Sequence, residues 1–157
     1  MNQHIDELRV PPEVVATTLT SLRAAGARNA EGVVLWLGRR DSGIEVVEAY
    51  VPEYESEHDF FAIPRDAMAE LLRHLGRTQT FLAAQVHSHP RHAFHSEADD
   101  TWAIVRHVGA LSLVVPWFAA ATSIDTFVAD IAAFSLSPQN KWLELDPEAV
   151  KGLIRIV

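Results

Sequence analysis

The sequence predicts one α/β domain, in which helices cover both faces of a mixed β-sheet to give three α/β/α layers. Strand-like and helix-like segments alternate along all 157 residues, and no long linker, repeat or low-complexity tract separates them. Hydrophobic residues make up 48% of the chain, which is enough for a full core in a domain of this size. We therefore expect residues 1–157 to form a single domain.

The N-terminal part predicts a short edge strand followed by a helix. Residues 5–10 alternate weakly between apolar and polar, and Pro11 and Pro12 then open a helix that closes near Gly26. The apolar side chains of this helix recur on one face, as in an amphipathic helix, at Val15, Leu19 and Leu22.

A hairpin and a long loop come next. Residues 32–37 form an almost wholly apolar strand, which a turn at residues 39–43 connects to a second strand at residues 44–51. Residues 52–63 are acidic and aromatic and predict a loop. That loop is long enough to be a candidate substrate-contacting element.

The middle of the chain predicts a second helix and two buried strands. Pro64 begins the helix, and the apolar run at residues 81–86 predicts a strand, as does the run at residues 111–116. Between these strands, residues 96–108 predict a helix with Trp102 in the core. The helix that Pro64 begins should pack on the sheet through residues spaced i, i+3, i+4 and i+7, which are Met68, Leu71, Leu72 and Leu75.

The C-terminal part leaves one alternative open. Residues 123–136 fit a short helix followed by a strand as well as they fit a single helix. Residues 147–157 predict a short helix that closes with a strand from residue 153 onwards.

Composition excludes several classes of function. The chain has no cysteine, which removes disulfides, thiolate zinc sites and cysteine nucleophiles. Its formal net charge of −8 argues against a nucleic-acid surface, which would normally be basic. We see neither a signal-peptide pattern nor a membrane-length apolar run, so we expect a soluble cytoplasmic protein.

The most informative stretch is residues 87–100. It begins with two histidines, His87 and His89, which come directly after the apolar run at residues 81–86. His87 and His89 should lie at the end of a buried strand, where side chains at i and i+2 share one face. Two imidazoles held side by side can bind one metal ion, at Zn–N distances of about 2.0–2.1 Å. His92 and His95 should lie in the following loop, facing solvent or substrate, and not bind the metal.

Ser96 and Asp99 look like the first turn of a helix, of the capping-box kind. The carboxylate of Asp99 could swing back as a third ligand. Two histidines, one aspartate and no fourth protein ligand would leave a coordination position for water, which is typical of catalytic zinc and not of structural zinc.

Each of these residues also has an ordinary structural interpretation. A single histidine is more often a surface or core residue than a ligand, but two neighbouring buried imidazoles without a partner are costly. Ser96 and Asp99 could serve only as a helix cap and a first-turn charge. A cap also fixes the geometry that a ligand needs, so the two interpretations of this turn do not compete.

With His-Ser-His-Pro and Ser-x-x-Asp in place, the chain resembles the JAB/MPN family of JAMM zinc peptidases. The family pattern is a distant Glu, then His-x-His, seven residues, and Ser-x-x-Asp. In the family the Glu precedes an apolar strand that ends in Gly seven residues later, and Glu31 with Gly38 fits this spacing. The resemblance covers most of the chain up to about Pro116 and implies a JAB/MPN-like three-layer fold with a mixed, curved sheet.

One departure from the family pattern leaves two aspartates in competition. Only six residues separate His89 from Ser96, so Asp99 keeps the Ser-x-x-Asp spacing whereas Asp100 keeps the distance from the histidines. Adjacent helical residues project about 100° apart, so only one of them can be a ligand. We favour Asp99, because the helix turn is rigid whereas the preceding loop can lose a residue freely.

The resemblance implies a role for each site residue. One zinc ion per chain, bound by His87, His89 and Asp99, would lower the pKa of its bound water toward about 7. Glu31 would take the proton from that water and pass it to the leaving amine. The hydroxyl of Ser96 would help to stabilise the oxyanion. The ordinary interpretation of Glu31 is a solvated loop carboxylate before a strand.

The resemblance further implies isopeptide or peptide bonds at the C-terminus of ubiquitin or ubiquitin-like proteins as substrates. The small size indicates a compact prokaryotic member that processes a ubiquitin-like precursor or conjugate, and associated conjugation enzymes would be its further partners. One alternative is trimming of a sulfur-carrier protein at its C-terminus. Another is a non-catalytic MPN-type scaffold that binds partners.

Overall fold

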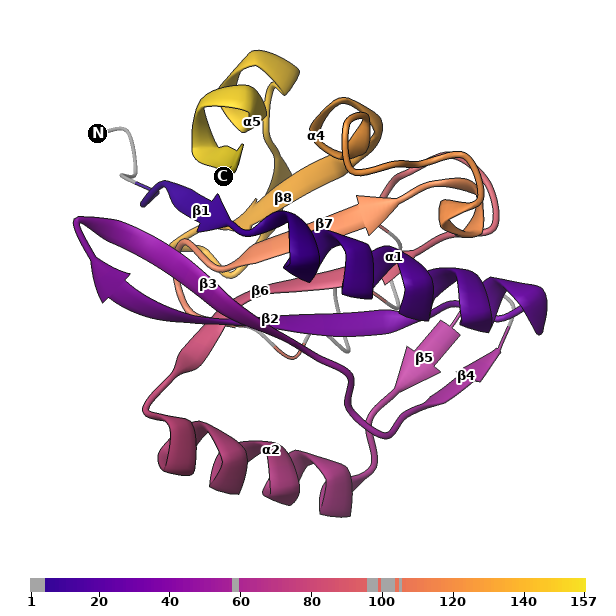
Figure 1. Cartoon of the computed structure of the whole chain (residues 1–157), viewed down its shortest axis with the longest axis horizontal. Helices are drawn as coiled ribbons and strands as arrows, with labels where there is room; N and C mark the ends of the chain where they lie inside the picture. Colours follow the sequence, from indigo (N-terminus) through magenta and orange to yellow (C-terminus); the bar gives the residue numbers. More distant parts are fainter. Residues whose placement is uncertain (1–4, 58–59, 96–98, 100–103, 105) are drawn as a thin grey trace.

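A mixed β-sheet forms the centre of the molecule (Figure 1). The computed structural model describes residues 5–57, 60–95, 99, 104 and 106–157. Among these residues the main sheet has eight strands in the order β10-β1-β3-β2-β6-β7-β8-β9. Their bounds are Leu8–Val10 (β1), Val33–Asp41 (β2), Gly43–Tyr50 (β3), Phe81–Ser88 (β6), Leu111–Val115 (β7), Ala132–Leu136 (β8), Trp142–Glu144 (β9) and Ile154–Ile156 (β10).

The sheet is mixed and curled. Strand β1 runs parallel to both β10 and β3, and β6 runs parallel to β7. The remaining neighbours, β2 with β3, β2 with β6, β7 with β8, and β8 with β9, are antiparallel. All of β7, the first six residues of β2 and the last six residues of β6 are buried, as expected for strands covered on both faces.

Helices pack against both faces of the sheet. The described helices are α1 (Pro12–Ala27), α2 (Arg65–Thr78), α4 (Phe127–Asp130) and α5 (Pro147–Leu153). Val34 and Trp36 of β2 belong to the larger core cluster, with residues of α1, α4 and α5. The alternating residues Val33, Leu35 and Leu37 point the other way and pack with α2. The α/β class is therefore confirmed, whereas the JAB/MPN form of the layers stays a prediction.

Several predicted elements are confirmed. Proline opens α1, and its predicted apolar face is buried. The first hairpin is antiparallel, with a tighter turn than expected, since Asp41 pairs with Gly43. Residues 123–136 form a short helix followed by a strand, which is the first of the two alternatives. The C-terminal helix and strand are also present.

Four details of the prediction are wrong. Strand β1 is not at the edge of the sheet, because the C-terminal strand β10 pairs with its outer side. Leu72 is 63% exposed, since Leu71 occupies the contact with the sheet. Residues 52–63 contain two short antiparallel strands, β4 (Glu55–Glu57) and β5 (Phe60–Ala62), and are not a plain loop. Strand β9 was not expected.

The helix predicted at residues 96–108 falls mostly on residues outside those that the structure describes, Trp102 among them. Residues 106–108 are described and are not helical, so the helix does not extend to residue 108 as predicted.

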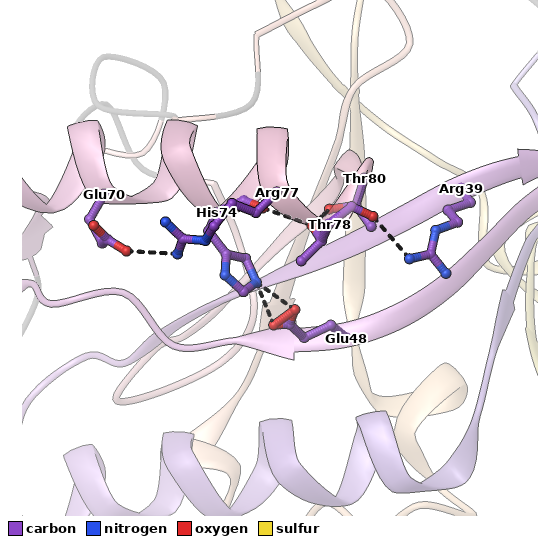
Figure 2. A network of polar contacts seen from close by, with 7 residues as sticks. All are labelled: Arg39, Glu48, Glu70, His74, Arg77, Thr78 and Thr80. Carbon is purple, nitrogen blue, oxygen red and sulfur yellow. Dashed lines mark hydrogen bonds and ion pairs between the residues drawn. The ribbon is translucent and has the colours of Figure 1, made fainter.

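Polar contacts join α2 to the first hairpin (Figure 2). Both carboxylate oxygens of Glu48 lie 2.7–2.8 Å from Nε2 of His74. Arg39 donates a hydrogen bond at 3.0 Å to the carbonyl oxygen of Thr78, the last residue of α2. On the exposed side, hydrogen bonds from Arg77 and Arg73 lower the pKa of Glu70 below its ordinary value. The Glu70 contacts lie within α2, whereas the bonds of Glu48 and Arg39 attach the C-terminal half of the helix to the hairpin.

None of the helices in the described ranges is both long and apolar enough to cross a bilayer.

Helix α1 closely approaches the turn after β7. A Cβ atom at Gly26 would lie 2.5 Å from the Cβ atom of Phe118, closer than van der Waals contact allows. Nearby, Nε of Arg23 donates a hydrogen bond to the carbonyl oxygen of Ala119 at 3.0 Å. The backbone of this turn, Trp117–Ala119, is left-handed at all three residues, with φ values of 52–62°. Such strain persists only where surrounding contacts impose it.

Replacement of Gly26 by Ala should therefore destabilise the protein by about 1–3 kcal/mol, because the added methyl group must displace the Phe118 turn. Gly76→Ala in α2 is the matched control, since nothing lies within 4 Å of a Cβ atom there. The control should gain up to about 1 kcal/mol from helix propensity. Urea denaturation measures both changes, and equal stability of the two variants would contradict the close packing.

Candidate metal centre

The two motif histidines lie where β6 ends. His87 is in β6, flanked by Val33 of β2 and Val114 of β7. His89 follows the strand, and its N–H donates a 2.9 Å hydrogen bond to the carbonyl oxygen of Val115. Both histidines are buried, and their ring centroids are 5.2 Å apart. The strand therefore presents both imidazoles at one place, as its sequence predicts.

Asp99 meets both histidines. Its carboxylate oxygen Oδ2 lies 3.0 Å from Nε2 of His89 and 3.3 Å from Nε2 of His87. The residue is only 4% exposed. Ligand atoms about 2.0–2.1 Å from a tetrahedral zinc ion lie about 3.3–3.4 Å from one another. The two distances are therefore close to those that a shared metal ion requires.

The donor set fits a metal site. Ligand atoms of His87, His89 and Asp99 all lie within 4.8 Å of one another, so the three residues could hold a metal ion. Neutral imidazoles and a carboxylate are ligands that zinc accepts, although other first-row divalent metals accept them too. Three protein ligands would leave a fourth position open for substrate or water.

Glu31 lies beside this cluster. Its side chain is 2% exposed, and its Oε1 is 3.7 Å from Nε2 of His89. Glu31 is therefore a buried carboxylate and not the solvated loop residue of the ordinary interpretation. Gly32 and Ser88 hold it there, because the Gly32 N–H donates to Oγ of Ser88 at 2.9 Å and the Ser88 N–H donates to the Gly32 carbonyl at 3.1 Å.

The structure brings together four of the five predicted site residues, which are Glu31, His87, His89 and Asp99. The fifth, Ser96, lies outside the described residues, and so does Asp100, the competitor of Asp99. Asp99 lies beside both histidines, and the choice between it and Asp100 stays a prediction. The chemical roles of all five residues remain predictions.

The other histidines of the stretch differ from each other. His92 is exposed, as expected of a loop residue. His95 is half-buried, and its Nε2 lies 3.0 Å from the hydroxyl oxygen of the buried Ser112. His95 is therefore not fully open to solvent, and the other part of the expectation, that it faces substrate, stays a prediction. Phe94 packs edge-on against His89, with ring centroids 4.5 Å apart.

The left-handed turn after β7 braces the histidine segment. The Phe118 N–H donates to the carbonyl oxygen of His89, and the Trp117 N–H donates to that of Arg91, both at 2.8 Å. Strand β6 lies between β2 and β7. These bonds therefore fix the backbone of His89 from the β7 side, whereas Glu31 lies on the β2 side. Sequence patterns do not predict three consecutive left-handed residues without glycine.

Two buried polar residues near the site, Ser88 and Gln85, were not among the predicted functional residues. Ser88 lies between the two histidines, and Gln85 lies inside the apolar strand; both are fully buried. The signal was available, because a polar residue within a buried strand needs hydrogen-bonding partners.

Comparison with known proteins identifies the family. No family model matches the chain. The sequence is 31% identical over 160 residues to "Probable metalloprotease y4jG" of Sinorhizobium fredii, and the match covers 98% of this chain and 96% of that protein. The chain belongs to this metalloprotease family. Membership in the family and the candidate metal site together indicate a metal-dependent hydrolase.

Solved structures share the fold. The solution structure of protein DSY2949 from Desulfitobacterium hafniense matches with a TM-score of 0.69 and covers 96% of this chain and 92% of that chain. The two sequences are only 16% identical, so this likeness concerns the fold alone.

We expect the protein to bind about one zinc ion per chain, and His87→Ala or Asp99→Ala to lose it, because removal of one ligand of three leaves a site that metals no longer prefer. Elemental analysis after dialysis measures the metal content. His92→Ala and Asp100→Ala are the matched controls and should retain the zinc. Unchanged zinc in the His87 and Asp99 variants would show that the metal binds elsewhere.

Proposed function

We propose that this protein is a JAMM-type zinc peptidase of the JAB/MPN family, which cleaves peptide or isopeptide bonds at the C-terminus of a ubiquitin-like protein. One observation carries the proposal. Glu31, His87, His89 and Asp99, four of the residues that the JAMM pattern names, converge in one buried cluster from distant parts of the chain. The metalloprotease relative supports the same class of chemistry.

The cluster fits hydrolysis better than a purely structural role. Burial of two carboxylates beside two imidazoles costs free energy, and apolar residues of similar volume would stabilise a scaffold more. A non-catalytic scaffold also has no use for the carboxylate of Glu31 beside three residues that could bind a metal.

His87, His89 and Asp99 would hold the zinc ion. When bound, zinc supplies a Lewis acid, which polarises the carbonyl group to be cleaved and acidifies water. We assign the proton transfers to Glu31, because its Oε1 lies 3.7 Å from Nε2 of His89. Glu31 itself lies just before a different strand, β2. In our proposal its carboxylate accepts a proton from the attacking water.

The same carboxylate completes the reaction. As the C–N bond breaks, Glu31 gives the proton to the leaving amine, so that one water is consumed and Glu31 returns to its starting state. Ser96 remains our candidate for stabilisation of the oxyanion, on the basis of the family pattern alone.

The proposed substrate is an extended C-terminal tail of a prokaryotic ubiquitin-like protein in the cytoplasm. The hairpin β4–β5 is drawn toward the end of the sheet where β2 begins (Figure 1). Acidic side chains gather near it, since Glu53, Asp66 and Glu70 line a small cavity with Tyr50. Such a surface favours basic side chains upstream of the cleaved bond, and the attraction should weaken with added salt.

The test is hydrolysis of a fusion that carries a Gly-ending ubiquitin-like tail. The zinc-loaded protein should cleave after the Gly, and Glu31→Gln should lose about 10²–10⁴-fold in kcat while zinc and folding remain, because the amide cannot accept a proton. Glu53→Gln, on the acidic surface, is the matched control and should retain kcat.

Three results would contradict the proposal in different ways. Near-normal turnover by Glu31→Gln would assign the base to another residue. A second fusion would carry a bulky residue in place of the penultimate Gly of the tail. Cleavage of this fusion as fast as the original one would argue for a less restricted peptidase. Failure to cleave any such fusion with zinc bound would favour the scaffold or the trimming of a sulfur-carrier protein.

A further inference from the structure

We infer that Gln85 is a positioning residue, which fixes the segment that carries Asp99 against β6 and so sets the affinity of the metal site. This inference rests on the proposed metal site. Gln85 bonds to Ser112 and to the backbone of Ile104, and it would act on the position of Asp99 through these bonds.

The amide of Gln85 is bonded at both ends. Its Nε2 donates a 2.9 Å hydrogen bond to the hydroxyl oxygen of Ser112 on the neighbouring strand β7. Its Oε1 accepts a 2.9 Å hydrogen bond from the backbone N–H of Ile104. The Ser112 hydroxyl in turn lies 3.0 Å from Nε2 of His95. One side chain therefore connects two strands with two points of the segment after the histidines.

Those two points bracket Asp99. His95 lies four residues before Asp99 and Ile104 lies five residues after it. The bonds of these two residues are therefore described anchor points on either side of Asp99 in the sequence. Gln85 is also two residues before His87 in β6, and side chains at i and i+2 share one face of a strand. The strand that presents the histidines therefore also anchors the aspartate.

The burial of this network argues that it is more than incidental. Gln85 and Ser112 are fully buried between β2 and β8, in strands that are otherwise almost wholly apolar. A buried amide is costly unless its donor and acceptor are both satisfied, and apolar residues would fill the same space without that cost. What the amide adds is a fixed position for the backbone of Ile104.

The experiment measures zinc affinity by competition with a chelator, together with stability in urea. Gln85→Met keeps the volume of the side chain and removes both hydrogen bonds. Ser112→Ala removes the Ser112 hydroxyl, and with it the bonds to Gln85 and to His95, but keeps the bond between Gln85 and Ile104. Thr18→Val is the matched control, because Thr18 is equally buried and accepts a 2.9 Å hydrogen bond from Nε1 of Trp36, but lies in α1.

We expect Gln85→Met to weaken zinc binding by about 10-fold, the lower end of the effects known for residues that orient metal ligands. Ser112→Ala should weaken it less, since the bond to Ile104 remains. Thr18→Val should lose stability but bind zinc as the wild type does. Cobalt substitution provides a second signal, because the visible absorption of bound Co²⁺ should change in Gln85→Met and stay unchanged in Thr18→Val.

Zinc affinity of Gln85→Met equal to that of Thr18→Val would overturn the inference and leave the proposed function standing. If Gln85→Met does not fold, the comparison of Ser112→Ala with Thr18→Val decides in the same way. A wild-type protein that binds no zinc would overturn both the metal site and the inference, so the two failures are distinguishable.

Discussion

The pairing of β2 with β6 is the constraint on which the rest of the structure depends. Its antiparallel register places Val33 opposite His87 and lets Gly32 and Ser88 exchange hydrogen bonds, which brings Glu31 beside His89. A slip of one residue would turn every side chain of β6 to the other face of the sheet. The apolar residues of both strands prevent that slip, because each face of the sheet packs against its own helices.

The same pairing imposes a cost on the fold. Glu31, His87, His89 and Asp99 are all withdrawn from water, and isolated charges in such a place are strongly unfavourable. We infer that a divalent cation offsets this cost, since it would attract the carboxylate of Asp99 and bind neutral imidazoles. The hydrogen bonds of Ser88, Gln85 and the turn after β7 hold the backbone in place around the cluster. The buried candidate ligands and the hydrogen bonds that hold the backbone around them thus lie together near the end of β6.

Local patterns in the sequence predict most of the elements, and the His-x-His spacing locates the candidate site. The errors concern contacts between distant segments. Residues 5–10 look like an edge strand until β10 returns from the end of the chain to pair with β1. Leu72 fits the helical period, but which of two neighbours faces the sheet depends on how α2 is set against it. Gln85 lies within a run that is otherwise apolar. Its role does not follow from that run, because its partners Ser112 and Ile104 are far away in the sequence.

X-ray absorption at the zinc edge would show directly which atoms bind the metal. We predict zinc with two imidazole nitrogens and with oxygen ligands at about 2.0–2.1 Å. The characteristic scattering from the outer atoms of two histidine rings should be present, with no more than four or five ligands in total. A zinc environment made of oxygen alone, or of one histidine, would contradict the site at the end of β6 and with it the proposed chemistry.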